Sequence, residues 1–224
     1  QGYYTSKPKP LFLEKISSDI IDEIISTNLE NRSEGTRKIY NARNETELDL
    51  LKLALEKYTD INIHQSKLTL IGDMSKQLKM NILIPDNSSC ELTIKNVNVL
   101  SGNNRPAIIL GEYSRLELNV EKKNKLSYSG IYVPQGSQLE IKGNGDLIID
   151  SFATVGIGIG NDFEHSYGDI FINMTGSIEI MSNNEDTVCI GGGYNTDDSE
   201  IKIISGYIKV DMHSKNSLAI GSFN

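Results

Sequence analysis

The sequence predicts an all-β fold, a right-handed parallel β-helix over residues 60–224, with a small helical N-terminal cap over residues 1–59. Three observations lead to this expectation. From Asp60 onward apolar and polar residues alternate, the alternating stretches are short and separated by turn residues, and the last third of the chain repeats its own pattern. A chain of 224 residues is long enough to bury a core of this kind.

The first 59 residues carry a helical period instead. Between residues 11 and 29 apolar side chains recur at three- and four-residue spacings, behind serines and acids that suit a helix N-terminus. A short strand at 38–40 precedes a second expected helix over 44–58, which starts with the capping-box pattern of Asn44 and Glu47. We expect these helices to cover the first coil, where strand edges would otherwise be unpaired.

Short alternating strands follow the helical segment. They are separated by Gly, Asn, Asp, Ser and Pro, with no helical stretch between them, as is typical of an all-β region. The expected strands include residues 61–63, 68–70, 82–84, 92–94, 97–99, 116–118 and 139–141.

The last third of the chain is a repeat. Residues 139–161 align with 170–193 at an offset of 31, and again, one residue shorter, with 201–224. The aligned columns are Ile141, Ile172 and Ile203; Gly145, Gly176 and Gly206; Leu147, Ile178 and Ile208; Ile149, Ile180 and Val210; Ile159, Ile190 and Ile220; and Gly160, Gly191 and Gly221. Such units cannot bury their apolar side chains alone, so we expect stacked coils whose columns form an aliphatic core.

The composition excludes several classes of protein. With 38% hydrophobic residues and no apolar run near 18 residues, we expect a soluble globular chain without membrane insertion. The net charge is -8, and after Leu126 four basic residues face thirteen acids, with no arginine beyond Arg115. This acidic half would repel phosphates, so we expect no nucleic-acid partner.

Two cysteines are too few and too distant for a disulfide framework. Cys90 and Cys189 lie about three repeats apart, which is about 14 Å at one strand spacing per coil. That separation exceeds what a disulfide can bridge, so we expect two free thiols that serve packing.

Each repeated corner contains the dipeptide Ile-Gly, and residues 190–193 are Ile-Gly-Gly-Gly. A short loop and an Ile-x-Ile strand follow. This pattern resembles the β-helical repeats of large surface proteins of Gram-positive anaerobes, whose full form is Gly-Ile-Gly-Gly-Gly. Residues 156–160 and 220–223 depart from that form. The resemblance covers residues 139–224 and implies an extracellular or cell-wall location. Because residue 1 is not Met and residue 224 falls within a repeat, we expect a piece of a longer protein.

Three functional interpretations of the glycines and acids in this part of the chain are possible. The glycines at 191–193 lack the following helix and Lys-Ser/Thr of a phosphate loop, so we interpret them as coil corners. The stretch 195–198, Asn-Thr-Asp-Asp, resembles the acids of polygalacturonase-type hydrolases, but the Gly-His-Gly and Arg-x-Lys of that family are absent. Pectate lyases need a basic residue near calcium-binding acids, and no arginine follows Arg115. We predict no catalytic residues.

The surviving candidate site lies on loops that follow consecutive Ile-Gly corners. Aromatic rings beside carboxylates and amides suit carbohydrate binding, and the acids could instead hold Ca²⁺ through oxygen ligands. No other cofactor is expected, and His165 has no spaced partner that would make a metal site. The predicted contact residues are Phe163, Tyr194, Asp162, Asn195, Asp197 and Asp198.

The function expected from these features is a non-catalytic extracellular or cell-surface module for adhesion or carbohydrate binding on a rigid scaffold. Its partner would be a glycan or a host protein. The alternatives are a polysaccharide-processing enzyme of the polygalacturonase or pectate-lyase kind, and a purely structural stalk. Fold alone does not separate these, because β-helices carry all of them.

Overall fold

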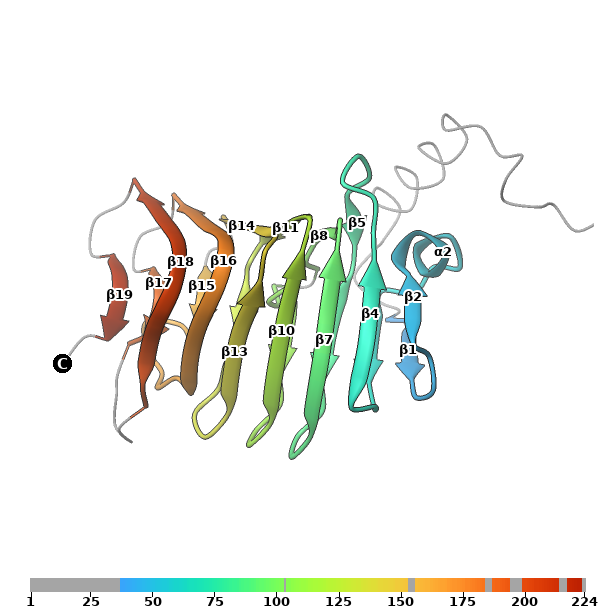
Figure 1. Cartoon of the computed structure of the whole chain (residues 1–224), viewed down its shortest axis with the longest axis horizontal. Coiled ribbons are helices and arrows are strands. Elements are labelled where there is room, and N and C mark those ends of the chain that lie inside the picture. The colour runs from blue at the N-terminus through green and yellow to red at the C-terminus, as the bar shows by residue number, and fades with distance from the viewer. Residues whose placement is uncertain are drawn as a thin grey trace, which may run out of the picture. The chain divides into compact units, whose positions relative to one another are not determined.

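The computed structural model describes residues 37–102, 104–152, 156–183, 187–193, 199–213 and 217–222. Within these ranges nearly all regular structure is β-strand, and the pairings between named strands are parallel. Strands that follow one another in the chain belong to different rows, and each pairs with its equivalents in the preceding and following coils (Figure 1). The all-β, solenoid-like part of the predicted fold is thus confirmed. The helix expected over 11–29 lies outside the described residues.

The strands form three rows. Row A is β1 (Ile39–Ala42), β3 (Asp60–Ile63), β6 (Asn81–Ile84), β9 (Ile108–Leu110), β12 (Ile131–Tyr132), β15 (Ile157–Gly160), β17 (Val188–Gly192) and β19 (Leu218–Ser222). Row B is β2 (Glu47–Asp49), β4 (Lys67–Ile71), β7 (Ser89–Lys95), β10 (Arg115–Glu121), β13 (Gln138–Gly143) and the first halves of β16 (Asp169–Ser182) and β18 (Ile201–Met212). Row C is β5 (Leu78–Lys79), β8 (Asn98–Leu100), β11 (Lys123–Tyr128), β14 (Asp146–Ser151) and the second halves of β16 and β18.

The register of the last coils reproduces the columns predicted from the repeat. Ile141 pairs with Ile172 and Ile172 with Ile203; Leu147, Ile178 and Ile208 form a second column. The columns that end in Val210, Ile220 and Gly221 are likewise in register. A one-residue slip would turn every aliphatic side chain outward, so burial of one face fixes this register.

The core is built from these inward columns. Ile141 and Ile172 are fully buried, but Ile203 in the same column is 42% exposed. The change occurs because β18 and β19 are the last strands of their rows in the described chain. Each column therefore gains hydrophobic stabilisation only where a further coil covers it.

Parallel pairing begins earlier than the helical cap prediction implies. β1 pairs with β3, and β2 pairs with β4, so residues 39–49 already belong to rows A and B. The helix expected over 44–58 is confined to α2 (Leu50–Leu55), and Asp49, not Asn44, caps it by accepting from the Leu51 and Lys52 amides. The pairing of β2 with β4 replaces the helix start that the capping pattern predicts. It can do so because hydrogen bonds within the sheet satisfy the same backbone amide and carbonyl groups.

A buried ion cluster joins the first coils. The Asp60 side chain is 2% exposed and accepts from Arg37 at 2.8 Å and Arg105 at 2.7 Å, and from the Thr59 hydroxyl at 2.7 Å. Burial alone would raise the pKa of Asp60, but the hydrogen bonds from Arg37, Thr59 and Arg105 outweigh it and lower that pKa. The Asp60 carboxylate thus links β3 to Arg37 and Arg105, which lie far from it in the sequence.

The predicted free thiols are confirmed: Cys90 and Cys189 are both buried and unpaired. Burial raises the pKa of Cys90 to about 12 and that of Cys189 to about 11. Among the described residues, no helix has the length and apolarity needed to cross a membrane.

Candidate functional site

The connections from row A to row B repeat one turn in three consecutive coils. Residues 85–88, 111–114 and 134–137 each end in a serine, and the register places them in equivalent positions. The Ser88 hydroxyl donates to the Pro85 carbonyl and the Ser114 hydroxyl to the Gly111 carbonyl, each closing its own turn. These turns stack into a corner on the surface.

The third residue of each turn has a left-handed backbone. Its φ is 55° at Asn87, 54° at Tyr113 and 77° at Gly136. Asn and Gly adopt this conformation readily, whereas a bulky aromatic residue there is strained. Strain of this kind persists only where the surroundings hold it and is found more often at binding sites.

The Tyr113 ring lies over the next coil. A Cβ added to Gly136 would come within 2.8 and 2.9 Å of two Tyr113 ring carbons, so the glycine is what makes room for the ring. The side chain nevertheless remains 68% exposed. The turn ladder therefore presents one flat ring to solvent.

The corner loop of the next coil, residues 162–168, is longer than these turns and forms a wall beside them. Asn161 is 6% exposed and organises the loop: its amide nitrogen donates to the Ser166 carbonyl at 2.6 Å, and its oxygen accepts from the Asp162 amide at 2.8 Å. His165 Nδ1 lies 2.6 Å from Asp162 Oδ1. A bridge between Pro134 and Tyr167 joins the loop to the turn below it.

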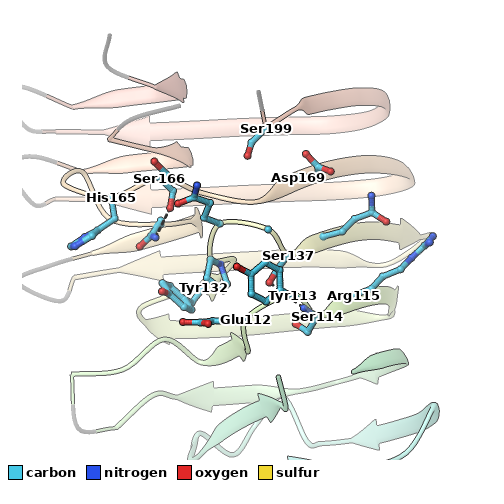
Figure 2. Close-up of a pocket in the computed structure, with 15 residues that line it drawn as sticks. Glu112, Tyr113, Ser114, Arg115, Tyr132, Ser137, His165, Ser166, Asp169 and Ser199 are labelled. Atoms are coloured by element: carbon cyan, nitrogen blue, oxygen red, sulfur yellow. Dashed lines mark hydrogen bonds between the residues drawn. The ribbon is translucent and has the colours of Figure 1, made fainter. Parts of the chain in front are cut away.

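Between the stacked turns and this loop lies an open cleft of about 730 Å³ (Figure 2). Its lining combines two aromatic rings with many hydrogen-bonding groups. The lining side chains include Tyr113, Tyr132, Glu112, Arg115, His165, Asp169, Gln135, Gln138, Asn161, Ser114, Ser137, Ser166 and Ser199.

A second hollow of about 770 Å³ lies near the junction of rows B and C. It is lined by Asn119, Glu121, Lys122, Gly143, Asn144, Asn173 and Thr175. No aromatic side chain lines it, so it lacks the flat apolar surface that the first cleft offers. The first cleft is therefore the stronger candidate site.

Glu112 and Asp169 are the two acids among the described residues that line the cleft. Burial raises the pKa of Tyr132, and the carboxylates of Asp162 and Glu112 raise it further, against a hydrogen bond with Asn161 that lowers it. Asp169 Oδ1 accepts from the Glu200 amide at 3.0 Å. Arg115 extends away from Tyr113 (Figure 2), and its guanidinium is 3.7 Å from the Glu140 carboxylate.

Two of the six predicted contact residues fall within the described chain. Asp162 and the 38%-exposed Phe163 both lie on the wall loop, beside the cleft and outside its lining. The Gly193 amide donates to the Asp162 carbonyl at 2.9 Å and the His165 carbonyl at 3.0 Å, so the residue that follows β17 is bound to this loop. Tyr194, Asn195, Asp197 and Asp198 lie outside the described residues.

The lining residues Tyr113, Tyr132, Glu112 and Asp169 were not predicted. A signal for Tyr113 exists in the sequence: the turns 85–88, 111–114 and 134–137 share a final serine and differ at the residue before it. In the part of the chain that the structure describes, no group of three or more His, Cys, Asp or Glu side chains could hold a metal ion.

Comparison of the chain with protein-family models, with curated proteins and with solved structures gave no match. The cleft must therefore be interpreted from its own geometry and chemistry.

Proposed function

We propose that this chain is a non-catalytic carbohydrate-binding module, and that its cleft between rows A and B holds a segment of a glycan. The scaffold we propose is a right-handed parallel β-helix. Three rows of parallel strands visited in turn support this fold, and the strong preference of parallel crossovers for the right hand supports the handedness.

Tyr113 is the observation that carries the proposal. Tyr113 is 68% exposed although its backbone is strained and a glycine is needed beneath its ring. Packing gives little reason for that arrangement, since most of the residue is accessible to solvent. A sugar ring stacked on it would bury its face and gain apolar contact.

The rest of the lining suits sugar hydroxyls. Amides of Gln135 and Gln138, hydroxyls of Ser114 and Ser199, and the Asp169 carboxylate offer both donors and acceptors around the ring. An open cleft with one flat apolar surface and convergent polar groups fits an extended oligosaccharide better than a compact, fully enclosed ligand. We place the module outside the cell or in the cell wall, where glycans are displayed and where adhesion is the expected role.

Glycan-array binding, followed by calorimetry on the best oligosaccharide, tests this function. Tyr113→Ala should weaken binding about tenfold, the effect of losing one stacked ring. Tyr207→Ala is the matched control, because Tyr207 is 66% exposed on β18, outside the cleft. Equal affinities for wild type and Tyr113→Ala would contradict the assignment of the cleft, and turnover of the glycan would contradict its non-catalytic character.

A further inference from the structure

The acids at the cleft are not matched by cations. Glu112 and Asp169 line it, and Asp162 lies behind Tyr132 on the wall loop. The lining contains Arg115, whose guanidinium faces Glu140, and His165, whose Nδ1 faces Asp162. Both basic side chains thus have a carboxylate partner already.

Glu112 differs from Asp162 and Asp169, whose carboxylates already accept hydrogen bonds. Among the described residues the Glu112 side chain makes no hydrogen bond or ion pair, although its amide donates to Asp86 Oδ1 at 2.9 Å. It follows Gly111 and precedes Tyr113 in the turn, and it is one of the residues that line the cleft. Figure 2 shows Glu112 in the same part of the cleft as Tyr132.

We propose that the glycan bound in this cleft carries protonated amino groups, as in a de-N-acetylated amino sugar, and that Glu112 with the Tyr113 and Tyr132 rings recognises one of them. This inference rests on the proposed glycan-binding function. A carboxylate beside aromatic rings attracts an ammonium group through a charge-assisted hydrogen bond and through the negative faces of the rings. The net charge of -8 adds a long-range attraction for a cationic polymer.

The chemistry favours an amino sugar over a neutral or acidic one. An acidic sugar would bring its carboxylate toward Glu112 and Asp169 without a free cation in the lining to compensate. A neutral sugar would leave the Glu112 carboxylate partly desolvated and unpaired. A lysine-rich peptide would supply cations, but it lacks the ring of hydroxyls that the amides and serines of the cleft are suited to bind.

The test compares a glucosamine tetrasaccharide with its fully N-acetylated counterpart by calorimetry, at a pH where the free amine is protonated. We expect wild type to bind the amine form about tenfold more tightly, a preference that Glu112→Gln removes. Glu47→Gln, on the exposed side of β2, is the matched control and should retain the preference. Added salt should weaken the amine form selectively.

The outcomes separate the two proposals. Equal affinity for both tetrasaccharides overturns the amino-sugar inference and leaves carbohydrate binding standing, provided that Tyr113→Ala still weakens both. Retention of the preference in Glu112→Gln also overturns it, provided that the variant has the wild-type circular dichroism spectrum. Binding of tetralysine but of neither sugar overturns both the inference and the proposed function.

Discussion

The glycine column of row A offers the sharpest test of how the coils stack. Gly160, Gly191 and Gly221 are in register, with φ values of 131°, 127° and 123°. A Cβ on Gly160 would fall well inside 3.0 Å of the Gly191 carbonyl oxygen in the next coil. A Cβ on Gly221 would meet nothing nearer than a Leu218 methyl carbon at 3.7 Å.

Gly160→Ala and Gly221→Ala should therefore both lower the free energy of unfolding through backbone strain, and Gly160→Ala should lower it further through a steric clash. Both place a side chain in a backbone region that is essentially restricted to glycine, at about 1–3 kcal/mol. Gly160→Ala must in addition push β15 and β17 apart by about 1 Å, which overpacks the coil and stretches its hydrogen bonds, at about another 1–3 kcal/mol. We expect a loss of about 2–6 kcal/mol for Gly160→Ala and of no more than about 3 kcal/mol for Gly221→Ala.

Urea unfolding followed by circular dichroism gives the free energy of unfolding of each variant. Hydrogen exchange should show the loss for Gly160→Ala in the amides of β15 and β17. If Gly160→Ala is no more destabilising than Gly221→Ala, then the close approach of successive coils does not require glycine and the stacking argument is refuted.

Two further predictions concern buried ionisable groups. Asp60→Asn should lower the free energy of unfolding by about 2–3 kcal/mol at neutral pH, because two arginines lose their shared carboxylate. Since folding lowers the pKa of Asp60, its contribution is present above the unfolded value of about 3.9 and is lost as pH falls through the lower folded value. Urea titrations from neutral to acidic pH should show wild type and variant converging, and a constant difference would contradict the linkage. Cys90 and Cys189 should resist iodoacetamide at mildly alkaline pH in the folded protein and react in urea, as mass spectrometry can measure; rapid alkylation of the folded chain would contradict their burial.

The repetitive part of the fold was the most predictable from sequence. The sequence repeat predicts the columns led by Ile141, Leu147, Ile149, Ile159 and Gly160, and each is a register column of the structure. Alternation with a period of 2 excludes a one-residue slip, which would expose the aliphatic face, and repetition at a fixed offset identifies which residues pair. In these repeats the local alternation of apolar and polar residues and the long-range strand pairing favour the same structure.

The N-terminal part was less predictable because local and long-range preferences compete. Asn44 and Glu47 form a plausible helix start, but Glu47 begins β2 and Glu45 accepts from the Arg43 and Asn44 amides instead. Pairing of β2 with β4 shortens the helix to α2. A capping pattern predicts the helix that a segment could form in isolation. Here the pairing of β2 with β4 in row B determines the structure instead.

The cleft shows why the candidate site was only partly visible in the sequence. The sequence points to aromatic residues in longer, later loops, and Asp162 and Phe163 do lie on the wall loop, beside the cleft and outside its lining. Tyr113, by contrast, sits in a short polar turn, and its left-handed backbone becomes visible in the sequence only when that turn is compared with the equivalent turns 85–88 and 134–137.

The position of the cleft follows from a break in the repeat. Where the corner turns keep one length, each stacks on its neighbour, as at 85–88, 111–114 and 134–137. The longer corner at 162–168 forms a wall, and Asn161 holds that wall in place through two part-buried hydrogen bonds. Tyr113 and Gly136 lie in the last two coils before the longer corner loop. There the Tyr113 ring can extend over the turn of the next coil and remain accessible to solvent. In a solenoid the regular coils supply rigidity. A binding site is therefore best sought where the loop length changes and where a solvent-facing turn position that suits Asn or Gly holds a different residue.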